Sequence, residues 1–150
     1  MSDVTNLEIR SLILTFEKFA KADWHKQTKF GIKPSEIRLL LWVKDISQQN
    51  EHGVTISEIS KCLMVTSPTV TQMVKSLNHN GFIERCVDAH DRRVADIKLT
   101  AKGENVVQQA SKRKVALYTG LIDSLGKEQT KQLISLLDQV YDYFDKASKE

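Results

Sequence analysis

Two helix start signals stand close together near the middle of the chain, and their spacing constrains the fold more than any other feature. The first, Thr55-Ile56-Ser57-Glu58, has the T-x-x-E form of a capping box, in which the threonine oxygen and the glutamate each bind an otherwise unpaired backbone N–H. The second, Thr66-Ser67-Pro68, places proline where its fixed φ suits a first helical turn. We therefore expect two short helices joined by a tight turn, which is a helix-turn-helix.

The second of these helices is predicted to be amphipathic and to end at Asn80-Gly81, a pair typical of a left-handed stop. Its apolar residues recur at i, i+3, i+4 and i+7 and are Val70, Met73, Val74 and Leu77. With a step of about 100° per residue, the opposite and exposed face is expected to hold Pro68, Gln72, Lys75 and His79, flanked by Thr69, Thr71 and Ser76. An exposed polar helix of this kind fits the major groove of B-DNA.

After Gly81 the pattern changes to two short runs, 82–87 and 94–99, which predict two β-strands. The link between them contains Asp91, Arg92 and Arg93 and is polar and charged. A two-stranded hairpin directly after a helix-turn-helix is a wing, and cations at its tip suit the narrow minor groove.

Amphipathic segments flank this central module. We expect one long helix over residues 5–27, a second that starts at Pro34 and ends near Asp45, and two more after Thr100, which caps the first of them. The first and last of these helices carry apolar stripes that a monomer would leave exposed, which favours a twofold homodimer. The alternative is that they cover their own domain.

Composition narrows the remaining possibilities. No apolar run approaches the roughly 18 residues of a membrane span, and Met1–Arg10 lacks the basic start and apolar run of a signal peptide. Cys62 and Cys86 have no CxxC spacing and are expected to be small buried residues in a reducing cytoplasm. The scattered histidines have no metal-ligand spacing. We therefore expect a cytoplasmic protein with no membrane association, no metal and no cofactor.

The central run resembles the winged helix of the MarR family of bacterial transcription regulators. The most specific part is Asp91-Arg92-Arg93-Val94 followed by Leu99-Thr100-Ala101-Lys102-Gly103. The element order also matches, so the resemblance covers about residues 5–147, with Met64 a departure at a turn position where small or flexible residues are commoner. It implies a mainly α (α+β) fold, a winged helix-turn-helix with a two-stranded β-hairpin wing and long N- and C-terminal dimerisation helices. Residues 1–150 would form a single domain, with 33–100 the DNA-binding module and 5–27 and 101–147 the dimerisation helices.

The resemblance implies a sequence-specific transcription regulator, expected to be a repressor and not an enzyme. It would bind a pseudo-palindromic operator in double-stranded DNA as a homodimer. Gln72 would pair with adenine and Lys75 with guanine or phosphate. In the wing, Asp91 would orient Arg93 while both arginines reach the minor groove or its phosphates. The expected DNA-binding residues are Ser67, Pro68, Thr69, Thr71, Gln72, Lys75, Ser76, Asp91, Arg92 and Arg93.

The resemblance also implies release from DNA by a small aromatic or anionic ligand bound between the dimerisation helices and the winged domain. The residues that would line such an effector site are Trp24, His25, Trp42 and Tyr118. Aromatic residues on helices are more often plain core, so this alternative stays open.

Three other functions remain open on the residues alone. Residues 66–100 hold five basic and four acidic side chains, a weak basic balance that also fits a winged-helix module that binds protein and no DNA. Neutralising Arg92 and Arg93 would distinguish a DNA-binding protein from such a module, because it should abolish binding to DNA and matter little for binding to protein. A thiol-based redox-responsive regulator would use Cys62 or Cys86. An enzyme is disfavoured, since the one dense acid/base cluster, His90 with Asp88 and Asp91, falls on the expected wing tip.

Overall fold

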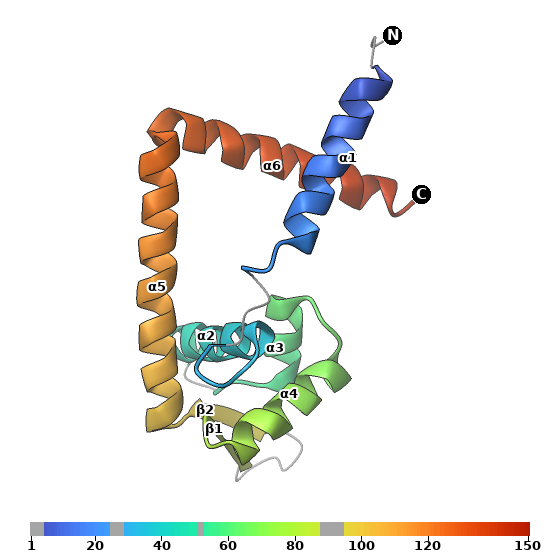
Figure 1. Ribbon diagram of the computed structural model, residues 1–150. Coiled ribbons are helices and arrows are strands. Elements are labelled where there is room, and N and C mark those ends of the chain that lie inside the picture. Colours follow the sequence, from blue (N-terminus) through green and yellow to red (C-terminus); the bar gives the residue numbers. More distant parts are fainter. Residues whose placement is uncertain (1–4, 25–28, 51–52, 88–94) are drawn as a thin grey trace. The chain divides into compact units, whose positions relative to one another are not determined.

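The computed structural model describes residues 5–24, 29–50, 53–87 and 95–150 (Figure 1). Contacts divide the chain into two compact units, Met1–Val107 and Gln108–Glu150. Within the described residues the elements are six α-helices and one two-stranded sheet, in the order four helices, two strands, two helices. The predicted mainly α (α+β) fold with a β-hairpin is confirmed. The predicted assignment of 33–100, 5–27 and 101–147 to DNA binding and dimerisation stays a prediction.

One hydrophobic core holds the first unit together. It is formed by α2 (Pro34–Gln49), α3 (Ile56–Leu63), α4 (Ser67–His79), the hairpin and the first turns of α5 (Ala101–Leu125). Its largest fully buried side chains are Leu39, Leu40, Val43, Val54, Ile59, Val70, Val74, Leu77, Ile83 and Ile97. Since burial of a Leu or Ile side chain contributes about 1.5–3 kcal/mol, this core is the main source of stability of the winged module.

The predicted start signals cap the helices as expected. The N–H of Glu58 donates to Thr55 Oγ1 at 3.2 Å and the N–H of Thr55 donates to Glu58 Oε2 at 3.3 Å, so the capping box of α3 is complete. Thr66 Oγ1 accepts the N–H of Thr69 at the start of α4, and Pro34 occupies the first turn of α2. Local sequence signals therefore set where the helix-turn-helix begins.

The end of α4 is a Schellman motif, as Asn80-Gly81 predicts. Gly81 has φ +80°, its N–H donates to Asn78 O at 3.1 Å, and the N–H of Phe82 donates to Leu77 O at 2.9 Å. Phe82 is buried beside this turn. The strand predicted from residue 82 therefore starts one residue later, because Phe82 is used to close the helix.

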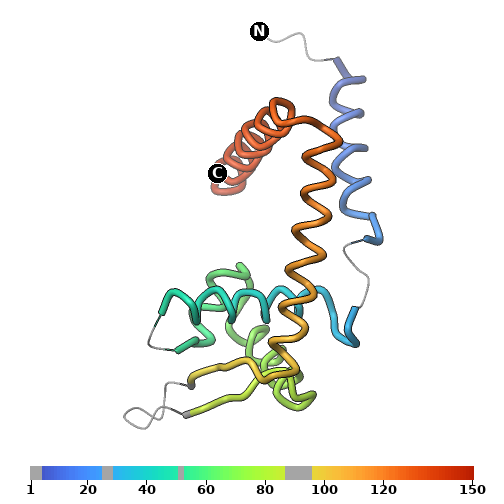
Figure 2. The backbone as a smooth tube through the Cα atoms, turned by 90° about the vertical axis from the view of Figure 1, so that its left-hand side faces the viewer, coloured from blue at the N-terminus to red at the C-terminus, as the bar shows by residue number. Residues whose placement is uncertain are grey.

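The hairpin consists of β1 (Ile83–Val87) and β2 (Ala95–Leu99), which run antiparallel with Ile83 opposite Leu99 (Figure 2). Ile83 and Ile97 are buried in the core, whereas Arg85 is exposed. The strands match the predicted runs 82–87 and 94–99 except at their first residues, and Val94 lies outside the described residues.

Two predicted helix ends are wrong. The first helix, α1 (Asn6–Lys21), stops well short of residue 27, because Ala22 is extended and the Trp24 ring meets the Phe19 ring edge-on at 6.0 Å. Residues five apart in a continuing helix point about 140° away from each other, so that contact requires the helix to have ended. The second helix runs to Gln49 and not to Asp45, because Ile46 extends its buried face.

The start of α1 carries a capping box that the sequence reading did not identify. The N–H of Thr5 donates to Glu8 Oε2 at 2.8 Å, and this bond, with that from the Thr5 hydroxyl, lowers the pKa of Glu8. No side chain of α1 is buried. Its exposed large apolar residues are Leu7, Ile9, Leu12, Ile13, Leu14, Phe16 and Phe19.

The second unit contains the rest of α5 and the whole of α6 (Lys127–Ala147), joined at Gly126 with φ +84°. No side chain of α6 is buried. Its exposed large apolar residues are Leu133, Ile134, Leu136, Leu137, Tyr141, Tyr143 and Phe144. None of the helices in the described part of the chain is long and apolar enough to cross a membrane.

Candidate nucleic-acid interface

Helix α4 buries one face and exposes the other, as the periodicity predicts. Val70, Val74 and Leu77 have no exposed surface, and Met73 is half-buried against the same core. The residues of the opposite face are all exposed and comprise Pro68, Thr69, Gln72, Lys75, Ser76 and His79. The exposed face carries amide, hydroxyl and ammonium groups, which are the groups that bind base edges and phosphates.

The first turn of α4 gathers several hydroxyl groups at the N-terminus of the helix. Thr66 Oγ1 and Thr69 Oγ1 share a hydrogen bond of 2.8 Å, and Thr71 Oγ1 donates to Ser67 O at 2.9 Å. Ser67 and Thr69 are exposed and Thr71 is half-buried. A helix N-terminus attracts anions, so this turn is suited to holding a phosphate while the middle of α4 faces the bases.

The turn between α3 and α4 closes on Met64, the residue that departs from the family pattern. Met64 is left-handed, with φ 55° and ψ 43°, and its side chain is 80% exposed. The N–H of Val65 donates to Ser60 O at 3.2 Å, and Ser60 Oγ donates to Val65 O at 2.6 Å. These bonds hold the two helices at a tight turn although the left-handed residue is not glycine.

The other end of α4 is fastened to the first turn of α5. Thr100 Oγ1 donates to Gly81 O at 2.6 Å, and Lys102 Nζ donates to Asn80 O at 2.9 Å while lying 4.4 Å from the centre of the Phe82 ring. The N–H of Gly103 donates to Thr100 Oγ1 at 3.1 Å. Apart from the Thr100 cap, the sequence reading missed this group, since contacts of residues some twenty positions apart carry no local signal.

The predicted wing residues Asp91, Arg92 and Arg93 lie outside the described residues, as do His90 and Asp88 of the acid/base cluster. The described strands on either side supply two more exposed cations, which are Arg85 on β1 and Lys98 on β2. The sequence reading did not single out Arg85.

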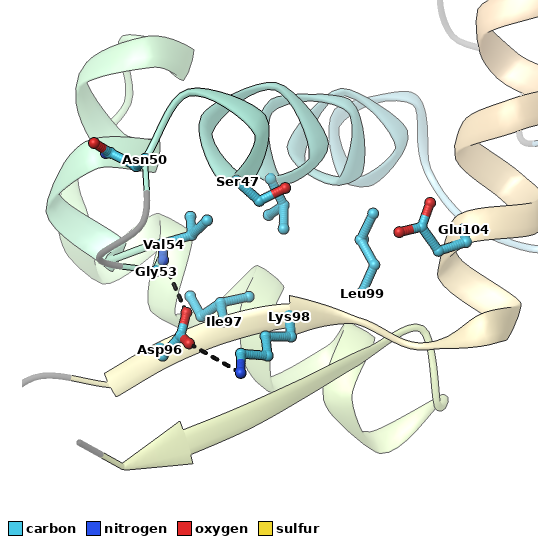
Figure 3. Close-up of a pocket in the computed structure, with 10 residues that line it drawn as sticks. Ser47, Asn50, Gly53, Val54, Asp96, Ile97, Lys98, Leu99 and Glu104 are labelled. Atoms are coloured by element: carbon cyan, nitrogen blue, oxygen red, sulfur yellow. Dashed lines mark hydrogen bonds and ion pairs between the residues drawn. The ribbon is translucent and has the colours of Figure 1, made fainter. Parts of the chain in front are cut away.

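The effector candidates do not meet in a described cavity. Trp24 and Tyr118 are exposed, Trp42 is 38% exposed, and His25 lies outside the described residues. Trp24 and Trp42 belong to the first unit and Tyr118 to the second. The winged unit has a cavity of about 320 Å³ between α2, the residues before α3, β2 and the start of α5 (Figure 3), and none of these aromatic residues lines it. The effector assignment stays a prediction.

The two cysteines differ from each other. Cys62 is half-buried and packs against the core, but Cys86, predicted to be buried, is exposed on β1. The prediction for Cys86 is wrong because its strand lies at the edge of a two-stranded sheet, where alternate side chains face solvent.

Comparison with known proteins gives a consistent result. A family model described as the MarR family matches residues 30–94, which include α2, α3, α4 and β1 and end just before β2. The transcriptional repressor MdtR of Bacillus subtilis is 27% identical over 133 residues, which cover 88% of this chain and 79% of that protein.

Two solved structures extend the likeness over nearly the whole chain. Streptococcus pneumoniae FabT in complex with DNA matches with a TM-score of 0.69 and 26% identity, covering 93% of this chain and 95% of FabT. Staphylococcus aureus MepR bound to ethidium bromide matches with a TM-score of 0.56 and 26% identity, covering 95% of this chain and 98% of MepR. MdtR is named as a transcriptional repressor and MepR as a transcription regulator, which confirms the prediction from the sequence of a regulator and not an enzyme.

Proposed function

We propose that this chain is a DNA-binding transcription regulator of the MarR family, and that it is a repressor that binds a pseudo-palindromic operator as a homodimer. MdtR, which resembles it over most of its length, is named as a repressor. FabT, its structural neighbour, is bound to DNA. A regulator of this kind reads bases with one helix per subunit and uses symmetry to read two half-sites.

The observation that carries the proposal is the exposed polar face of α4. Gln72 lies at its centre and Lys75 one turn further along, both exposed, above a buried row of Val70, Val74 and Leu77. In the major groove the Gln72 amide suits the N6 and N7 atoms of adenine, and Lys75 suits guanine or a phosphate. Ser67, Pro68, Thr69, Thr71 and Ser76 border these two residues and approach the DNA backbone.

In the wing, Arg92 and Arg93 contact the minor groove or its phosphates, and Asp91 orients Arg93. Support for this comes from the sequence, which places these residues between the two strands of the hairpin that follows α4. Few cations lie near the reading face, so each subunit makes few phosphate contacts and one subunit alone binds weakly.

Homodimerisation supplies the affinity for DNA that a single subunit lacks. Each of the helices α1 and α6 exposes a row of large apolar side chains in the single chain, and such a surface is typical of an interaction site. A twofold interface that buries such side chains also sets two copies of α4 at a fixed separation, about one turn of DNA for two half-sites.

Selection of bound sequences from a random duplex pool tests the proposed function directly. The expected result is an enriched inverted repeat with half-sites about one helical turn apart. A pool that gains no sequence preference, with weak salt-sensitive binding only, would instead point to a winged-helix module that binds protein.

On the selected operator, Gln72→Ala is expected to weaken binding by about 1–3 kcal/mol and to relax the preference at one base pair, because a bidentate base contact is lost. Lys75→Ala is expected to reduce the slope of log K against log salt concentration by about one if the lysine binds a phosphate. Fluorescence anisotropy at several salt concentrations measures both effects. Lys112→Ala, on exposed α5, is the matched control for a lost charge. If Gln72→Ala lowered the affinity for every DNA sequence by the same factor, base reading by Gln72 would be contradicted.

A small aromatic ligand that releases the protein from its operator completes the proposal, supported by the likeness to MepR bound to ethidium bromide. Trp24, Trp42 and Tyr118, with His25, are the proposed contacts. We expect at least one member of a panel of aromatic anions and cations to quench tryptophan fluorescence and to weaken operator binding about tenfold, a coupling typical of allosteric ligands. A panel that leaves operator affinity unchanged throughout would count against an aromatic effector.

A further inference from the structure

Asp96, on β2, connects the hairpin to the segment that leads into the helix-turn-helix (Figure 3). Its Oδ1 accepts the backbone N–H of Val54 at 2.9 Å, and its side chain is only 22% exposed. Next to it, the N–H of Ile97 donates to Val54 O at 2.9 Å. One side-chain and one backbone hydrogen bond therefore join β2 to a residue some forty positions earlier in the chain.

Gly53 leaves room for the Asp96 carboxylate. It has φ +83°, and a Cβ at this position would overlap the carboxylate oxygens. Both its conformation and the close approach require glycine. The side chain of Val54, immediately after, is fully buried. The carboxylate is thus confined between the backbone at Gly53 and its bond to Val54, which fixes β2 in one position against this segment.

This contact stands next to both parts of the proposed DNA interface. Val54 directly precedes Thr55, the N-cap of α3. On the other side, Asp96 follows Arg93 by only three positions in the sequence. The Asp96–Val54 bond therefore connects β2, the strand that follows the wing arginines in the sequence, to the start of the helix-turn-helix.

The charge of Asp96 does not itself favour DNA binding. A carboxylate close to phosphates repels them, and its ion pair with Lys98, 3.6 Å away and mostly exposed, contributes little. What the side chain does supply is an acceptor for the Val54 N–H, a group that would otherwise be unpaired beside the core.

We propose that Asp96 is a positioning residue, which holds β2, the strand that follows the wing arginines in the sequence, in one position against the helix-turn-helix and thereby raises the affinity for DNA. This inference rests on the proposed function, in which Arg92 and Arg93 contact DNA. Preorganisation of this kind raises affinity by removing an entropy loss that binding would otherwise include.

The test compares operator binding of Asp96→Ala, Asp96→Asn and Glu84→Ala with that of the wild type. Asp96→Ala is expected to weaken binding about three- to tenfold although it removes a negative charge, because β2 loses its bond to Val54. Asp96→Asn keeps an acceptor oxygen and is expected to bind at least as tightly as the wild type. Glu84→Ala removes an exposed charge from the facing strand and serves as the control for charge alone. If electrostatics alone acted, all three variants would bind more tightly.

A double-mutant cycle with Arg92→Ala/Arg93→Ala separates positioning from a general loss of structure. In that background Asp96→Ala is expected to change affinity less than twofold, while exchange of the Val54 amide hydrogen is still faster than in the wild type. Undiminished binding by Asp96→Ala, or an equal loss in both backgrounds, would overturn the inference while leaving the wing contact intact. If Arg92→Ala/Arg93→Ala alone binds normally, the proposed wing contact fails, and the inference fails with it.

Discussion

Replacing Gly103 by alanine is expected to lower the free energy of unfolding by about 2–4 kcal/mol, although alanine is ordinarily the better helix residue. Gly103 is buried in the first turn of α5, where an added Cβ would overlap the carbonyl oxygen of Phe82. That oxygen also accepts the N–H of Thr100 at 3.2 Å, so the backbone cannot move aside without losing a hydrogen bond. Urea unfolding at one fixed protein concentration measures the effect.

Gly120→Ala provides a control with the opposite expected sign. Gly120 lies in the same helix, and nothing is within 4 Å of the position its Cβ would occupy. Alanine there is expected to raise the free energy of unfolding by about 0.5–1 kcal/mol, through helix propensity alone. If Gly103→Ala were as stable as the wild type, the first turn of α5 would have to shift away from Phe82 without loss.

A glutamate in place of Leu137 is expected to raise the dissociation constant of the proposed dimer by about 100-fold or more. Leu137 is 54% exposed on the apolar face of α6, and a twofold interface over this face would bury an unpaired charge from each subunit. Operator affinity should fall by a similar factor, because two linked reading helices bind far more tightly than one. Sedimentation equilibrium and titration of the operator measure the two effects.

Ser135→Glu adds the same charge on the polar side of α6, about 160° around the helix from Leu137. Ser135 is exposed and contacts Gln139, also on that side. We expect this variant to remain dimeric and to bind the operator normally. Should Leu137→Glu also remain fully dimeric, the apolar face of α6 would lie outside the interface, and the proposed role of residues 101–147 would need to change.

Most of the winged module could be predicted from local sequence because its boundaries depend on neighbouring residues. Two helix starts are set by hydrogen bonds within one turn, between Thr55 and Glu58 and between Thr66 and Thr69. Gly81 set a helix end through its positive φ. Such signals involve residues three or four apart, and so they are visible in the sequence.

What could not be predicted depends on partners far away in the chain. The bond between Asp96 and Val54 spans 42 positions, and that between Lys102 and Asn80 spans 22. No local spacing distinguishes such an aspartate from one on a solvated strand. The end of α2 has the same origin, since the burial of Ile46 in the core extends that helix.

The bonds at the start of α5 have a mechanical consequence. Thr100 and Lys102 join the start of α5 to the residues that end α4, through hydrogen bonds to Gly81, Asn80 and Phe82. Three hydrogen bonds therefore fix the first turn of α5 to the C-terminal end of α4. A tilt of that first turn is expected to shift the end of the reading helix with it.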